Sequence, residues 1–209
     1  MRFILAVLAG LALVLSLGCD ENLDPKTPEG AMHRLRDALM ARDVGALLDA
    51  SSAATRKQLA ELQTLLQEQR VAIAERYPDD HRTDAKAAFP AGALEAADTA
   101  ALFEALVEPE LKKLDLDERL QYGMSALGRA NLTPTGDRAT VTTRSGESVE
   151  FVLEDEVWKT TVFERAIEQN LNRAKLNRQV LEENLKVFEE MKRREEKKAR
   201  EAAAAAETP

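Results

Sequence analysis

The apolar pattern of this chain changes its period twice, and these changes limit the fold more than any other feature. Up to about residue 127, apolar side chains recur every three or four positions, which is typical of amphipathic helices. Between about 130 and 163 they alternate with polar side chains, which is typical of strands with one buried face. Helical spacing returns from Glu164. The sequence therefore predicts an α+β fold with N-terminal helices, an antiparallel meander of three or four strands (about 130–163) and a long C-terminal helix.

Capping and helix-breaking residues set the expected element boundaries. Thr27 followed by Pro28 and Glu29 is typical of a helix start, and Pro78 of a helix end. Pro109 predicts a new turn that opens at Glu110. We expect helices at about 28–42, 43–48, 53–77, 99–107 and 117–127, with loops around a short helix at 78–97. Glycine-containing turns at 135–137 and 145–147 would separate the strands.

The first nineteen residues have the pattern of an export signal. Arg2 gives a positive start, and residues 3–17 form an apolar run that falls short of the ~20 residues a spanning helix needs. Gly18 and Cys19 follow, and Cys19 is the only cysteine of the chain. No disulfide can therefore form within the chain, and its fold must depend on its core.

This segment resembles the signal of bacterial lipoproteins, which signal peptidase II cuts before a cysteine. The resemblance implies that Cys19 becomes the N-terminus and carries lipid on its sulfur and its amine, which anchors the protein at a bacterial membrane facing the periplasm. The family usually has Leu where this chain has Ser16. Asp20 after the cysteine implies retention in the inner membrane, with the outer membrane as the alternative. An ordinary secretory signal is the competing interpretation of the segment.

These observations divide the chain into four parts. We expect a signal peptide at 1–18, a lipidated cysteine with a tether at 19–26, a single α+β domain at 27–191, and a charged, alanine-rich tail at 192–209. The tail lacks large apolar residues and mixes both charge signs, so we expect a solvated helix that is frayed or disordered at its end.

The net charge of −8 argues against nucleic acid as a partner, because nucleic acid requires a basic surface. Metal binding requires several convergent ligands, and the two histidines, His33 and His81, lie far apart and beside no cysteine. We expect His33 at the boundary or surface of its helix. The chain contains no Gly-x-Ser-x-Gly motif and no phosphate-binding glycine loop. We therefore expect no catalytic residues, no metal and no cofactor.

The order of helices and strands resembles the nuclear-transport-factor-two-like fold of some exported lipoproteins. The similar stretches are 27–35, 43–48 and the closing strand Val157-Trp158-Lys159. The resemblance implies a cystatin-like cone of curved sheet around helices, with a pocket that Trp158, Tyr122 and Tyr77 would line. The alternative for Trp158 is a place in the core, where a lone tryptophan on a sheet face usually lies, and we favour it.

The C-terminal helix carries an apolar stripe with coiled-coil spacing. Its members are Ile167, Leu171, Leu181, Leu185 and Phe188. Such a stripe can bind a partner or a second copy, which would make a homo-oligomer, or it can cover the protein's own sheet and helices. Arg178 within the seam favours the second alternative.

Together these features favour a membrane-anchored lipoprotein that acts as a non-catalytic binding or interaction module of the cell envelope. Its partner would be an envelope protein or a small molecule. The alternatives are a small-molecule-binding or weakly catalytic cone, and a structural oligomer formed through the C-terminal helix.

Overall fold

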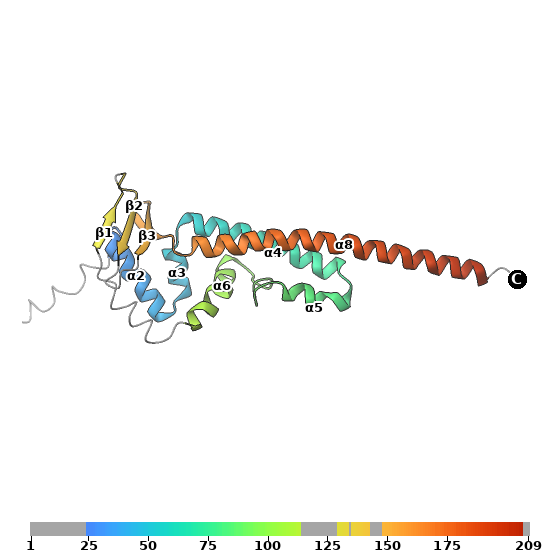
Figure 1. Cartoon of the computed structure of the whole chain (residues 1–209). Helices are drawn as coiled ribbons and strands as arrows, with labels where there is room; N and C mark the ends of the chain where they lie inside the picture. Colours follow the sequence, from blue (N-terminus) through green and yellow to red (C-terminus); the bar gives the residue numbers. More distant parts are fainter. Residues whose placement is uncertain (1–23, 114–128, 134, 143–147, 207–209) are drawn as a thin grey trace, which may run out of the picture. The chain divides into compact units, whose positions relative to one another are not determined.

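The computed structural model describes residues 24–113, 129–133, 135–142 and 148–206, and it has the predicted α+β architecture with a long C-terminal helix (Figure 1). The chain divides into two compact units. The first contains residues up to Thr55 together with Glu108–Glu164, and the second contains Arg56–Val107 together with Arg165–Pro209. That residues 27–191 form a single domain stays a prediction.

The first unit contains an antiparallel meander with the strand order β1-β2-β3-β4. The strands are β1 (Arg129–Leu132), β2 (Arg138–Thr142), β3 (Ser148–Glu154) and β4 (Val157–Thr160). Ala139 pairs with Phe151 and Val141 with Val149, and all four side chains are buried. The predicted alternation is thus confirmed for β2 and β3. The predicted turn at 135–137 is also present, with Gly136 in the left-handed region, whereas 145–147 lies outside the described residues.

Two capped helices precede the sheet in the chain, as predicted. The Thr27 hydroxyl accepts a hydrogen bond from the Gly30 amide (3.1 Å) at the start of α2 (Pro28–Ala41). The Asp43 carboxylate does the same for the Ala46 amide (2.9 Å) at the start of α3 (Val44–Ala50). α2 packs across β1, β2 and β4. This packing forms the core of the first unit.

The segment before α2 is fastened to β4 by Trp158. The backbone amide of Trp158 donates to the Pro25 carbonyl (2.9 Å), and the indole Nε1–H donates to the Lys26 carbonyl (3.1 Å). Trp158 is only 7% exposed, so it lies in the core, as favoured from the sequence. We call these two hydrogen bonds the Trp158 clasp.

Both long helices begin at a buried polar cluster in the first unit. The Ser52 hydroxyl accepts from the Thr55 amide (3.1 Å), which caps α4 (Ala53–Arg76), and donates to Glu164 (2.6 Å) at the first residue of α8 (Glu164–Ala206). The Ser52 amide donates to the Thr160 carbonyl at the end of β4 (3.0 Å). We call Ser52, Thr55, Thr160 and Glu164 the helix-start cluster.

In the second unit α4 and α8 run parallel, side by side (Figure 1). The Gln69 side chain donates to the Ala174 carbonyl (3.0 Å), and farther along Arg76 pairs with Glu189 (3.1 Å). α5 (Asp79–Ala87) runs in the opposite direction along α8, because His81 stacks on Phe188 while the Ala88 carbonyl lies near Asn177. α4 has a buried stripe that consists of Leu59, Leu62, Leu65, Leu66 and Ile73.

Two segments of the chain correct or limit the predictions. α6 (Thr99–Lys113) continues through Pro109, so the new turn expected at Glu110 is wrong. Proline removes one helical hydrogen bond but its fixed φ is compatible with a helix, and exposed pairs such as Glu108–Lys112 (2.9 Å) bracket it. The helix predicted at 117–127 lies outside the described residues. At the other end, 192–203 is an exposed helix, as predicted; its fraying stays a prediction.

His33 is buried, at 7% exposure, and its expected place at a boundary or surface is wrong. The buried face of α2 is wider than a narrow stripe, since Ala31 and Met32, the two residues before His33, are buried as well. Burial lowers the pKa of the His33 imidazole, nearby Arg36 lowers it further, and Asp37 acts in the opposite direction.

Because its folded-state pKa lies below 6.5, His33 should make the protein less stable in acid. The unfolded chain takes up the proton first as pH falls, so the free energy of unfolding should decrease below 6.5. His33→Gln should flatten this slope, measured by urea unfolding at a series of pH values. His81→Gln, at a half-exposed histidine, is the control and should retain the slope. An unchanged slope in His33→Gln would contradict the assignment.

Gly30 is required by the turn that leads into the clasp. A Cβ at this position would overlap the Asp24 carbonyl oxygen, which accepts hydrogen bonds from the Thr27 amide and hydroxyl (both 3.1 Å). We expect Gly30→Ala to lower the free energy of unfolding by about 1–3 kcal/mol. Gly45→Ala is the control, because its new Cβ would meet only the end of the Asp43 side chain at 3.4 Å and should cost little. Equal stabilities in urea titration would disprove the steric argument.

Candidate functional site

Of the three aromatic residues expected to line one pocket, two belong to different units and the third lies outside the described residues. Trp158 lies in the first unit beside an open depression of about 810 Å³, and its indole N–H is already bonded to Lys26. Tyr77 belongs to the second unit, and Tyr122 lies outside the described residues. Cys19 and Asp20, the residues of the predicted anchor, also lie outside them.

Tyr77 is a core residue of the second unit, at 3% exposure. Its hydroxyl donates to the Leu181 carbonyl (3.2 Å), and its ring meets Phe188 edge to face with 5.2 Å between the centroids. Burial raises the pKa of the Tyr77 hydroxyl, partly offset by a hydrogen bond from Asn184. These contacts join the end of α4 to α8.

The predicted interaction stripe of α8 is covered within the second unit. Ile167, Leu171, Leu181 and Leu185 are buried, and Phe188 is half-buried between Tyr77 and His81. The alternative that the stripe covers the protein's own helices accounts for it, and the stripe is not available to a partner. A different set of apolar α8 side chains is exposed by half or more: Leu176, Val180, Val187 and Met191.

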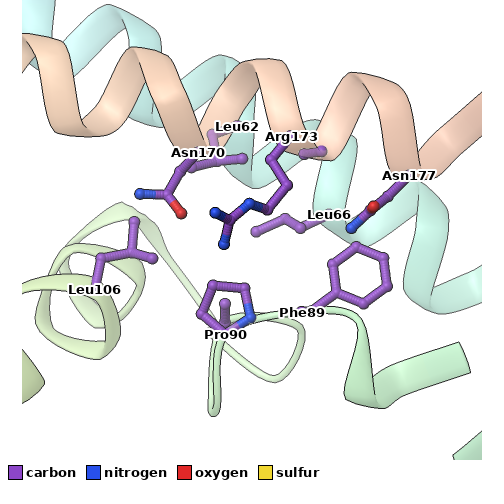
Figure 2. A pocket seen from close by; sticks show the side chains of 10 residues that line it. Leu62, Leu66, Phe89, Pro90, Leu106, Asn170, Arg173 and Asn177 are labelled. Carbon is purple, nitrogen blue, oxygen red and sulfur yellow. The ribbon is translucent and has the colours of Figure 1, made fainter. Parts of the chain in front are cut away.

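A narrow depression with room for about 10 Å³ lies in the second unit (Figure 2). Its apolar wall comes from three elements: Leu62 and Leu66 of α4, Phe89, Pro90 and Ala93 of the turn after α5, and Leu106 of α6. Its polar rim comes from α8 and consists of Asn170, Arg173 and Asn177. We call it the apolar pocket.

Arg173 makes no ion pair with any residue that the structure describes, although its guanidinium reaches toward the apolar pocket between Asn170 and Pro90 (Figure 2). The two asparagines beside it use only their nitrogens: Asn170 donates to the Ala166 carbonyl (2.9 Å) and Asn177 to the Ala88 carbonyl (3.3 Å). Their carboxamide oxygens accept no hydrogen bond from the described part of the chain. The rim therefore offers one free cation and two free acceptors.

A second depression, of about 230 Å³, continues from the first between α5 and α8. Phe89 and Asn177 line both depressions, so the two are neighbouring parts of one groove. Farther along, the lining is Val180, Leu181 and Asn184 on the α8 side and His81, Asp84, Ala85 and Ala88 on the other. We call the whole the α8 groove.

The groove is lined mainly by groups that form hydrogen bonds or pack against apolar atoms. It presents amides, one guanidinium and aliphatic carbons, and its two titratable groups, His81 and Asp84, lie on the half-exposed α5. Within the described ranges, no group of three or more histidine, cysteine or acidic residues is placed to hold a metal ion. The close Ser52–Glu164 pair lies in the first unit, where Ser52 is occupied as a helix cap.

Comparison with known proteins found no matching family model, no matching curated protein and no matching solved structure. In the residues that the structure describes, no helix combines the length and the apolar character needed to cross a membrane.

Sequence reasoning missed the groove, although one signal for it was present. Asn170, Asn177 and Asn184 recur every seven residues, which places them on one face of α8. This face lies beside the buried stripe. That it meets the turn at Phe89 and Pro90 depends on tertiary packing, which the spacing alone does not give.

If Tyr77 is a structural residue, removal of its hydroxyl should affect stability and leave binding unchanged. We expect Tyr77→Phe to lower the free energy of unfolding by about 1 kcal/mol, because the buried hydrogen bond from the hydroxyl to the Leu181 carbonyl is lost. Chemical denaturation followed by circular dichroism measures this. Phe163→Leu, which changes an aromatic residue of the first unit, is the control for a loss of stability that any aromatic substitution would cause. A fully stable Tyr77→Phe protein would contradict the structural role.

Proposed function

We propose that this chain is a lipid-anchored, non-catalytic binding module of the bacterial cell envelope, facing the periplasm, with the α8 groove as its binding site. One observation carries the binding role. The groove places an unpaired guanidinium and two free carboxamide oxygens beside an apolar pocket. Such convergent polar groups around an apolar depression are the usual form of a recognition site.

The membrane anchor rests on the sequence. Residues 1–19 have a positive start, a short apolar run and a cysteine after a small residue, and the resemblance to lipoprotein signals assigns the lipid to Cys19. Two or more acyl chains hold a protein at a bilayer stably, whereas one gives marginal binding. Asp20 places the protein in the inner membrane within this proposal.

A non-catalytic role is supported by the groups that the groove presents. Catalysis by acid–base or nucleophilic routes requires a nucleophile or proton acceptor held by an orienting partner. Asn170, Arg173 and Asn177 are not such groups at neutral pH, because carboxamides do not titrate and arginine stays protonated. The rim of the apolar pocket is therefore suited to hold a ligand and not to transform it, and His81 and Asp84, farther along the groove, lie on the exposed helix α5.

The anchor is tested by replacing its cysteine. Cys19→Ala should release the protein from membranes that are washed with carbonate, whereas the wild-type chain should stay bound. Ser16→Leu restores the residue that the lipoprotein family usually has and should remain bound, which controls for changes in the signal. Mass spectrometry of the purified chains should show added lipid in the wild type and in Ser16→Leu, but not in Cys19→Ala. Full retention of Cys19→Ala would refute the anchor and leave the groove untouched.

A further inference from the structure

We infer that a second copy of this chain packs antiparallel against α8 and covers the apolar side chains that α8 leaves exposed. These side chains are Leu176, Val180, Val187 and Met191, and we call them the outer stripe. In the dimer, Leu176 of one copy meets Met191 of the other, and Val180 meets Val187. The inference goes beyond the proposed function and does not depend on it, because it concerns the association of two copies.

The outer stripe is a second apolar face of α8. A helix turns by about 100° per residue, so the four side chains share one side of α8, roughly 135° around from the buried stripe that contains Leu181 and Leu185. Single exposed apolar residues are common on protein surfaces. Four of them in line over about 22 Å of helix form a continuous strip of the kind that marks an interaction site.

The spacing of the outer stripe suits a copy of itself. Its members are four, seven and four residues apart, and this series reads the same in both directions. Two antiparallel helices related by a twofold axis between Glu183 and Asn184 therefore place every member opposite another member. An interface of this symmetry requires a self-complementary patch. Steps of four and seven residues also keep side chains on the seam between two coiled helices.

The charges beside the outer stripe favour the antiparallel orientation. Glu183 and Lys186 are exposed on the same flank of the stripe. In an antiparallel pair, equal flanks of the two helices face each other, so each Glu183 lies near Lys186 of the other copy. The two glutamates also approach each other near the axis, and the two lysines offset this repulsion. In a parallel pair, opposite flanks meet and these ion pairs cannot form.

Arg194 supports the same orientation. It lies on the side of α8 that carries the outer stripe, so a parallel pair would bring it against its own copy. In the antiparallel pair the two Arg194 side chains are about 30 Å apart along the helix. The residue opposite Arg194 is then Arg173, whose guanidinium points toward the apolar pocket (Figure 2). Glu190 lies 3.7 Å from the Arg194 guanidinium within α8 and reduces its charge.

The length of the contact predicts a reversible dimer. A helix pair in contact over about 22 Å buries less than the roughly 1,600 Å² of a standard interface. We therefore expect a dissociation constant of about 10–100 μM. Val180 and Asn184 also line the second depression. The second copy would thus add a wall to the α8 groove.

Sedimentation velocity of the full chain in mild detergent, from about 1 to 500 μM, measures the association. We expect monomers at low concentration and dimers at high concentration. Val187→Glu should weaken association by about tenfold or more, because it buries a carboxylate in the seam beside Glu183. Val71→Glu is the control: Val71 is an apolar residue of α4 that is 46% exposed, and this variant should dimerise like the wild type. Thermal melts show whether each variant is folded.

Introduced cysteines test the register. Oxidation of a mixture of Leu176→Cys and Met191→Cys chains should give a covalent dimer between the two variants. Each variant alone should form no more covalent dimer than the wild type, which reports any background from Cys19. In a parallel dimer, by contrast, each variant would cross-link with itself.

A charge exchange tests the ion pairs. Lys186→Glu should weaken association severalfold, because it places four carboxylates around the twofold axis. Addition of Glu183→Lys to this variant exchanges the two charges and should restore association to near the wild-type level. A double variant as weak as Lys186→Glu alone would contradict the antiparallel pairing.

Three other outcomes would also overturn the inference. The first is a chain that stays monomeric at every concentration, and the second is equal association of the wild type and Val187→Glu. The third is a cross-link in native membranes from Val187→Cys to a different envelope protein without any covalent dimer. The outer stripe would then dock another protein and not a second copy.

Discussion

The fold depends on the helix-start cluster, where the hydroxyl of one buried serine holds the beginnings of two long helices. Ser52 and Thr55 are fully buried, and a buried hydroxyl without a partner costs a few kcal/mol, so each group must be bonded. Ser52 satisfies an orphan amide of α4 and the Glu164 carboxylate of α8, and its own amide bonds to β4. Three elements from distant parts of the sequence are thereby fixed at one residue. A glutamate at the first position of α8 also suits the positive end of the helix dipole.

Much of the fold could be predicted because local patterns decided it. Thr27, Asp43 and Pro78 act through their own backbone neighbours, and the period of two in β2 and β3 follows from one buried sheet face. Pro109 and His33 were misjudged because their environments depend on packing from elsewhere in the chain. A helix tolerates an internal proline when the rest of it is well packed, and a histidine is buried when the covered face of its helix is wide.

The candidate site was harder to predict than the fold. Trp158 and Tyr77, the aromatic residues predicted to line a pocket, donate hydrogen bonds to backbone carbonyls and are part of the core. The apolar stripe of α8 likewise covers internal helices. The polar groups that line the groove, asparagine oxygens and one arginine, are common on any helix surface. They line a groove only because the turn at Phe89 packs beside them, and the sequence shows this turn only as an irregular segment.

The Trp158 clasp has a mechanical consequence for an anchored protein. If lipid holds Cys19, only five residues lie between it and Pro25, and these six residue steps span about 20 Å at most. The first unit would then stay close to the bilayer, because the short linker limits its distance from the lipid. A pull on the lipid would first load the hydrogen bonds between the Asp24 carbonyl and Thr27, and then the two bonds of the clasp that join this segment to β4. The Trp158 clasp would thus pass part of the pulling force to β4, which lowers the force on the start of α2.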